Sequence, residues 1–186
     1  VLSTIPISFA KFMDNPNVNW LYSSEPDEGT GFRSIEIPRG KILGGSSSIN
    51  GMVFVRGQSQ DYDHWAQLGN KGWSYKDVLP YFKKMETYKG PNSVYRGQTG
   101  PLIVTNPMET NAFYDAMFKG AEEIGIQRNP DYNAGQQDGV GMTQATIWKG
   151  KRQSTAVSYL HPIKKRKNLR ILTDTHVENV IIQNNK

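Results

Sequence analysis

One glycine-serine run, residues 40–51 (GKILGGSSSING), most constrains how this chain can fold. The adjacent Gly44 and Gly45 allow positive φ angles, and they let a ligand or a second backbone come close because no Cβ stands in the way. Residues 46–48 then add three serine hydroxyls and unhindered amide N–H groups. The run therefore predicts a tight backbone turn surrounded by small polar side chains.

This run has two interpretations. In the first, it is a glycine turn followed by a helix that the serines cap. In the second, the amide N–H groups at the start of that helix bind a phosphate or pyrophosphate. Asn50 would then supply a side chain that both donates and accepts hydrogen bonds, and the apolar stretch 52–55 (MVFV) would pack beneath the ligand. For such residues considered alone, the capped turn is the commoner outcome.

Composition excludes several classes of function. A chain of 186 residues can bury a core, and the absence of cysteine excludes disulfides, thiolate metal ligands and thiol nucleophiles. The formal net charge of +5 comes largely from residues 164–167 (KKRK), a run typical of a solvated loop, so we expect no nucleic-acid partner. No apolar stretch approaches the roughly 18 residues that span a bilayer, so we expect no integral membrane segment. We expect a cytoplasmic protein, either free or attached peripherally to a membrane.

The residue patterns predict a mixed fold, α/β or α+β, with three helices. The first helix begins at Ser74, which forms a capping-box pattern with Asp77, and Pro80 favours a short or kinked helix. The third predicted helix, the last along the chain, covers residues 154–160. The second helix has Asn111 as its cap, ends at Gly125 and carries an apolar stripe at helical spacing. The stripe consists of Phe113, Ala116, Met117, Gly120, Ala121 and Ile124.

Strands and loops alternate with these helices. The loops are rich in glycine, proline and asparagine and cover residues 89–99 and 127–141. The second of them is long enough to be functional or packed against a neighbour. The predicted strands are residues 33–37, 102–105, 143–148, 169–172 and 177–182.

Residues 39–57 (RGKILGGSSSINGMVFVRG) resemble the first signature of the glucose–methanol–choline (GMC) oxidoreductases, a family of FAD-dependent alcohol oxidases and dehydrogenases. The resemblance extends over nearly the whole chain, and it is greatest for the choline-dehydrogenase-like and bacterial alcohol dehydrogenase branch. Its further segments are 61–65 (DYDHW), 72–75 (GWSY), 79–82 (LPYF), 100–102 (GPL), Arg152 with Ser154, 159–162 (YLHP) and Val177.

The resemblance implies an architecture of two domain portions. Residues 1–99 would belong to the FAD-binding domain and include the flavin-binding block 39–57 and a lid-like loop. Residues 100–150 would form part of the substrate-binding domain. Residues 151–186 would return to the FAD-binding domain.

The resemblance also implies where FAD is held. Ile42 is a further contact, and the backbone of Val177 would meet the adenine. Ile49 stands where some family members have a histidine joined covalently to the flavin, so we expect FAD to be bound non-covalently. The contacts near the diphosphate and the flavin ring would be Ser46, Asn50, Gly51, Met52 and Val53.

Two parts of the family pattern are not found in the sequence. The family begins with a strand and a G-x-G-x-x-G turn for the pyrophosphate, and residues 139–144 (GVGMTQ) lack the third glycine and follow a polar loop. The catalytic histidine, with its second histidine or asparagine, would lie beyond Lys186, so we assign no catalytic residue in this chain. We therefore expect a fragment of a longer protein that does not by itself oxidise alcohols or bind FAD stoichiometrically.

The resemblance implies hydride transfer from the carbon of an alcohol to N5 of the flavin, followed by reoxidation by oxygen or an electron carrier. Choline, aliphatic primary alcohols and sugar-like alcohols all remain open as the small-molecule substrate. One alternative is a GMC relative that does not oxidise alcohols, such as a lyase or a fatty-acid photodecarboxylase. Another is a nucleotide-binding module without catalysis.

The histidines do not indicate a metal site, because none has a partner three or four residues away. His64 lies in a stretch rich in aspartate and tryptophan and is interpreted as a surface or packing residue. His161 precedes a proline at a predicted helix end. Asp61 and Asp63 are interpreted as part of a helix start rather than as an acid–base pair.

Overall fold

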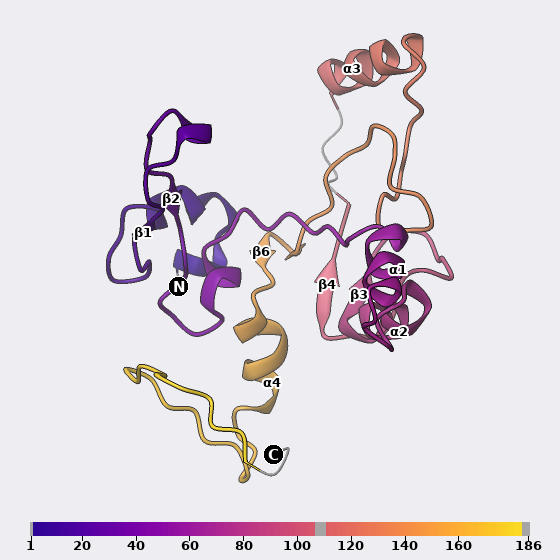
Figure 1. The fold of residues 1–186 in the computed structure, drawn as a ribbon. Helices are drawn as coiled ribbons and strands as arrows, with labels where there is room; N and C mark the ends of the chain where they lie inside the picture. The colour runs from indigo at the N-terminus through magenta and orange to yellow at the C-terminus, as the bar shows by residue number, and fades with distance from the viewer. Residues whose placement is uncertain (1, 107–110, 184–186) are drawn as a thin grey trace.

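The computed structural model describes residues 2–106 and 111–183. Short helices and three two-stranded sheets alternate along the chain, joined by long irregular segments (Figure 1). This mixture agrees with the predicted α/β or α+β class. In these residues no helix combines the length and the apolar character needed to cross a membrane.

The three sheets are small, and the distance along the chain between the two paired strands differs from sheet to sheet. Strands β1 (Tyr22–Ser23) and β2 (Glu36–Ile37) pair antiparallel, as do β5 (Ile147–Trp148) and β6 (Lys151–Arg152). Strands β3 (Glu86–Tyr88) and β4 (Leu102–Val104) pair parallel.

The helices are α1 (Ser59–Gln67), α2 (Tyr75–Met85), α3 (Ala112–Glu123) and the single turn α4 (His161–Ile163). Shorter turns are η1 (Leu2–Thr4), η2 (Pro6–Phe12), η3 (Glu28–Thr30), η4 (Gly45–Ser48) and the π-helical η5 (Ala156–Leu160).

The central core lies on the β3–β4 sheet. Tyr88, Leu102 and Val104 from the two strands pack with Phe54 from an extended segment that crosses the sheet region, and Met85 packs against them. Burying these apolar side chains stabilises the fold at the point where three separate parts of the chain meet.

Two predicted helices are confirmed, and only the first of them differs from the prediction at its start. Helix α2 begins directly after Ser74, but the Ser74 hydroxyl donates to the Asp77 carboxylate instead of capping a backbone N–H, and the helix continues through Pro80. Helix α3 begins as predicted, because Asn111 Oδ1 accepts the N–H groups of Phe113 and Tyr114 at 3.0 and 3.1 Å.

The apolar stripe of α3 is not buried as its periodicity suggests. The helix stands apart from the rest of the molecule (Figure 1), and Phe113 and Ile124 are 73% and 76% exposed. The buried side chain is Phe118, which packs under the Arg128 guanidinium with 4.9 Å between the ring centroid and Cζ. The helical spacing therefore predicted the helix correctly, and most of its apolar stripe faces solvent in the structure.

The strand predictions were mixed. Strand β4 and the loops 89–99 and 127–141 are confirmed, whereas only the last two residues of each of the predicted strands 33–37 and 143–148 lie in a strand. Strands predicted at 169–172 and 177–182 are wrong: the described part of both segments has no ladder partner, and Val177, Val180 and Ile181 are 72–82% exposed. A strand needs a neighbour to pair its backbone groups, and apolar residues alone do not supply one.

Candidate functional site

The glycine-serine run forms a tight turn whose glycines are structurally required. Gly44 and Gly45 have φ angles of +89° and +54°. A Cβ on Gly40 would lie 2.2 Å from the carbonyl oxygen of Gly45, so the two ends of the turn can approach only with glycine there. A Cβ on Gly45 would meet nothing within 4 Å, which leaves that side of the turn open.

The serine hydroxyls hold this turn together. Ser46 Oγ accepts the Gly40 N–H at 3.1 Å, and Ser48 Oγ donates to the Leu43 carbonyl at 2.8 Å. Ser47 Oγ donates to the Gly44 carbonyl and accepts the N–H of Thr155, which joins the run to a segment more than a hundred residues later. The turn is followed by the four-residue η4, in which the Ser47 N–H bonds to the Gly44 carbonyl, and the phosphate-binding interpretation of this run stays a prediction.

An extended segment follows the turn and presents two different faces. Met52, Phe54 and Arg56 are buried, whereas the intervening Val53 and Val55 are 57% and 59% exposed. The segment is held by hydrogen bonds from Phe54 N–H to the Gln144 carbonyl and from Thr146 N–H to the Met52 carbonyl, both 2.9 Å.

Gly51 is exposed, as are Val53 and Val55, although the φ angle of +64° at Met52 interrupts the extended backbone between them. A Cβ on Gly51 would meet nothing within 4 Å. We call this surface of Gly51, Val53 and Val55, with the exposed Asn50 beside it, the open face. It offers exposed apolar side chains next to an amide, which suits a ring system that carries polar atoms at its edge.

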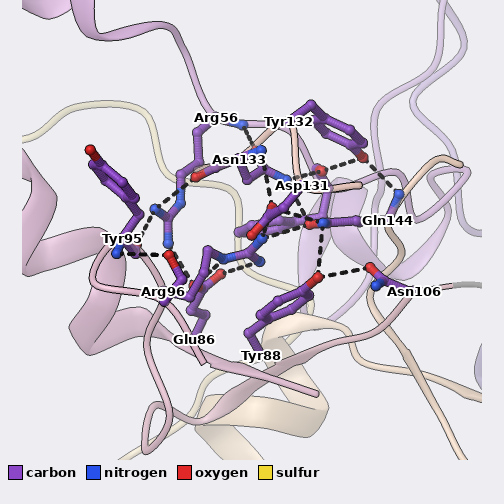
Figure 2. Close-up of polar contacts among 12 residues, drawn as sticks. Arg56, Glu86, Tyr88, Tyr95, Arg96, Asn106, Asp131, Tyr132, Asn133 and Gln144 are labelled. Atoms are coloured by element: carbon purple, nitrogen blue, oxygen red, sulfur yellow. Dashed lines mark hydrogen bonds and ion pairs between the residues drawn. The ribbon is translucent and has the colours of Figure 1, made fainter. Parts of the chain in front are cut away.

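The buried side of the segment ends in a network of charges (Figure 2). Arg56 Nη2 lies 2.6 Å from Glu86 Oε1, and Arg96 Nε lies 2.8 Å from the same oxygen. Arg96 also pairs with Asp131, so two buried cations meet two carboxylates. Burial lowers the pKa of Arg56. Burial disfavours the charge of Arg96 too, but the hydrogen bonds and charges of Glu86 and Asp131 outweigh this and raise its pKa.

Amide and phenol side chains complete this network. Gln144 Oε1 accepts from Arg96 and Asn133, and Asn133 Nδ2 also donates to the Phe54 carbonyl at 3.0 Å. Tyr88 stacks under Arg96, with 3.7 Å between the ring centroid and the guanidinium carbon. The network therefore fixes the far end of the extended segment and the position of the open face.

A cleft of about 830 Å³ lies beside the first residues of the glycine-serine run. Trp20, Lys41 and Ile42 line one wall, and residues 172–176 line the other. Lys41 Nζ lies 4.9 Å from the centroid of the Trp20 ring, and the His176 ring contacts Trp20 edge-on at 5.9 Å. The volume is within the range of small-molecule and cofactor sites.

A family model described as GMC oxidoreductase matches residues 28–186, which is most of the chain. The chain belongs to the GMC oxidoreductase family. The resemblance inferred from the glycine-serine run is thus confirmed.

Individual GMC relatives support this membership. An oxygen-dependent choline dehydrogenase of Sinorhizobium fredii is 42% identical over 182 residues, which are 98% of this chain and 33% of the relative. The solved structure of a pyridoxine 4-oxidase from Mesorbium loti has a TM-score of 0.85 at 28% identity, covering 92% of this chain and 34% of that one. A formate oxidase variant from Aspergillus oryzae, studied for FAD modification, has a TM-score of 0.82 at 25% identity, covering 98% and 33%. The chain spans about a third of the length of the curated relatives it matches.

The residues that the GMC resemblance assigns to FAD fall into two places. Asn50, Gly51 and Val53 lie at the open face, whereas Met52 is buried, with an exposure of 5%. Ile42 lines the cleft, and Val177 directly follows its His176 wall. The predicted residue Ser46 connects the two places through its bond to Gly40.

Sequence reasoning did not assign a role to Arg152, the residue that the GMC resemblance marked with Ser154. Its side chain is 1% exposed and donates to the backbone of Ser47 and Asn50. The turn and Arg152 are separated by about a hundred residues, so only the three-dimensional fold brings them together.

The remaining candidates have structural positions. Asp61 accepts the N–H of Gln58 at the start of α1, and Asp63 accepts the N–H of Tyr75 at the start of α2. These contacts agree with the interpretation of both aspartates as part of helix starts. Across residues 2–106 and 111–183, no group of three or more histidine and carboxylate side chains could hold a metal ion.

Proposed function

We propose that this chain forms part of an FAD-dependent oxidoreductase that acts on the CH–OH group of an alcohol. The observation that carries the proposal is the open face, an unobstructed apolar strip beside Asn50 in a member of the GMC family. Relatives named as choline dehydrogenase and pyridoxine 4-oxidase support this class of reaction.

The flavin ring would lie on the open face, with Gly51 and Val53 under it and Asn50 at its edge. Met52 would contribute backbone contacts, since its side chain is buried on the other side. The remainder of FAD would extend past Ser46 into the cleft, where Ile42 and the backbone at Val177 would meet it. Lys41 at this cleft would favour the negative charge of the diphosphate.

FAD would be bound non-covalently, without a covalent link at the position of Ile49. The residue at this position is a hydrocarbon side chain with no nucleophilic atom, and it is 1% exposed.

In the proposed reaction the alcohol would be oxidised to a carbonyl compound. A base would take its hydroxyl proton, and bound flavin would supply the chemistry that accepts the hydride from its carbon. This chain would bind and orient the ring and keep water from its covered side. No residue within 1–186 is assigned as the base. Oxygen or an electron carrier would serve as the final acceptor, and the alcohol would be choline, an aliphatic primary alcohol or a sugar-like alcohol.

We also propose the division into domain portions 1–99, 100–150 and 151–186. The last portion makes close contacts with the glycine turn, through Thr155 to Ser47 and Arg152 to Asn50. These contacts support a return of the chain to the FAD-binding portion after residue 150.

The proposal is tested by blocking the open face in the full-length protein. Gly51→Leu places a side chain where nothing lies within 4 Å, so the fold should tolerate it while the flavin is excluded. The matched control is Gly120→Leu on α3, whose Cβ also meets nothing within 4 Å.

We expect flavin absorbance at about 450 nm in the purified wild type and the control, bleached when alcohol is added without an acceptor, and little of it in Gly51→Leu. A wild-type protein without flavin would contradict the proposal. Flavin that no alcohol bleaches would favour a non-oxidising relative instead.

A further inference from the structure

Arg152 reaches the open face from beneath and binds Asn50 twice. Its Nη1 donates to the Asn50 carbonyl at 2.6 Å and to the Asn50 side-chain Oδ1 at 2.8 Å. The same atom donates to the Ser47 carbonyl at 3.2 Å, and Arg152 Nε donates to the Ser3 carbonyl at 2.9 Å. Four oxygen atoms from three residues thus hold one guanidinium in a fixed position.

These contacts determine which end of the Asn50 amide faces outward. Oδ1 accepts from Arg152 and also from the Met52 N–H at 3.1 Å, which uses both of its lone pairs. In the described residues, every hydrogen bond of the Asn50 side chain is made by Oδ1. The Nδ2 amino group, with two donor hydrogens, is therefore the end presented to the open face.

The charge on Arg152 prevents the amide from turning over. Turned over, the amide would place its amino group against the guanidinium, with donor facing donor. No carboxylate in the described residues pairs with Arg152, and its Nη2 is buried without a hydrogen-bond partner there. Burial lowers the pKa of Arg152. The polar oxygen of Asn50 is thus one of the few groups that solvate this cation.

We propose that Arg152 is a positioning residue that locks the Asn50 amide, so that Nδ2 donates a hydrogen bond to an acceptor atom of the bound flavin ring, a carbonyl oxygen or an unprotonated ring nitrogen. The inference rests on the proposed function, in which the open face carries the flavin. It adds a rule of recognition: the atom that meets Asn50 is a hydrogen-bond acceptor and not a ring N–H.

Asn50→Asp in the full-length protein tests this rule. The carboxylate keeps the acceptor that Arg152 and Met52 bind, and it pairs with the uncompensated guanidinium, so the apoprotein should be at least as stable as wild type. It replaces the outward donor by an acceptor. We expect the Kd for FAD, measured by titrating apoprotein, to rise about tenfold or more, with a shift of the visible flavin band.

The matched control is Asn111→Asp. Asn111 also uses Oδ1 to accept two N–H groups, but it caps α3, the helix that stands apart from the other elements in Figure 1. The change of charge and the chemistry are the same, so FAD affinity should stay within about twofold of wild type.

Arg152→Met tests the lock itself, because it frees the amide to turn over. We expect a several-fold higher Kd for FAD, and in this background Asn50→Asp should cost affinity by a different factor, since the two residues act together.

The outcomes separate the two proposals. Wild-type protein that takes up no FAD would overturn the proposed function and this inference together. Wild type that binds FAD, with an Asn50→Asp variant that binds it equally or more tightly, would overturn the inference alone. An Arg152→Met variant with unchanged affinity and band shape would show that Arg152 does not position Asn50.

Discussion

Arg96 and Arg152 are both almost completely buried, at 2% and 1% exposure, yet the groups that surround their charges differ. Arg96 meets Glu86 and Asp131 in a network where cations and carboxylates balance. Arg152 meets only carbonyl and amide oxygens, and one of its nitrogens has no partner among the described residues.

The difference separates a closed site from an open one. The Arg96 network binds segments of the chain to one another and leaves little hydrogen-bonding capacity for a ligand. Arg152 keeps an uncompensated charge beneath a surface residue, and the amide it holds ends in free donors at the open face. The first arrangement mainly stabilises the fold, and the second would orient the surface that we propose for flavin binding.

The largest expected effect comes from breaking the closed site. Glu86→Gln removes the carboxylate that Arg56 and Arg96 share and leaves a positive charge in excess. We expect the free energy of unfolding to fall by about 3–5 kcal/mol, measured by denaturant titration. The control Glu122→Gln breaks the Arg128 pair, whose side chains are about half exposed, and should change it by about 0–1 kcal/mol. Equal effects would mean that the network is not closed as described.

A smaller loss of stability is expected from Arg152→Met. The substitution removes a buried charge without leaving an unpaired opposite charge, and Met fills much of the same space. The carbonyl groups of Ser3, Ser47 and Asn50 lose a donor, so we expect the free energy of unfolding to fall by about 1–3 kcal/mol. A loss as large as that of Glu86→Gln would indicate that an anion compensates Arg152 in solution, and the comparison would fail.

The two sites also differ in how far the sequence predicts them. The glycine turn and Asn50 were found because glycine pairs and small polar residues act locally, within a dozen positions. Helices α2 and α3 were found for the same reason, since capping residues and helical spacing are local signals.

The charge networks could not be found in this way. Glu86 and Asp131 are 45 positions apart along the chain, and each looks like an ordinary surface carboxylate until the fold brings Arg96 between them. The strands at 169–172 and 177–182 were wrong for a related reason, because the partner that makes a strand cannot be read from the strand itself. Arg152 was marked only by its match to the family pattern.

The smallest expected effect, and the most selective, comes from Tyr88→Phe in the closed site. Its hydroxyl donates to Asn106 at 3.1 Å and lies 3.3 Å from Gln144 Nε2, so its loss should lower the free energy of unfolding by about 1 kcal/mol at neutral pH. Tyr81→Phe, with a side chain 71% exposed on α2, is the control and should have almost no effect.

The same variant tests the closed site by pH. Burial raises the pKa of Tyr88, so the native state holds this proton more tightly than the unfolded chain does. Its contribution is complete below the unfolded value of about 10 and is lost as the pH rises above it towards the native pKa. Wild type should therefore lose stability on going from neutral pH to pH above about 10, and Tyr88→Phe should lose less. Tyr75, Tyr132 and Tyr159 also have pKa values raised by burial, so part of the slope remains in the variant. An unchanged slope would mean that water reaches the Tyr88 hydroxyl, and the network around Arg96 would then be as open as the surface around Asn50.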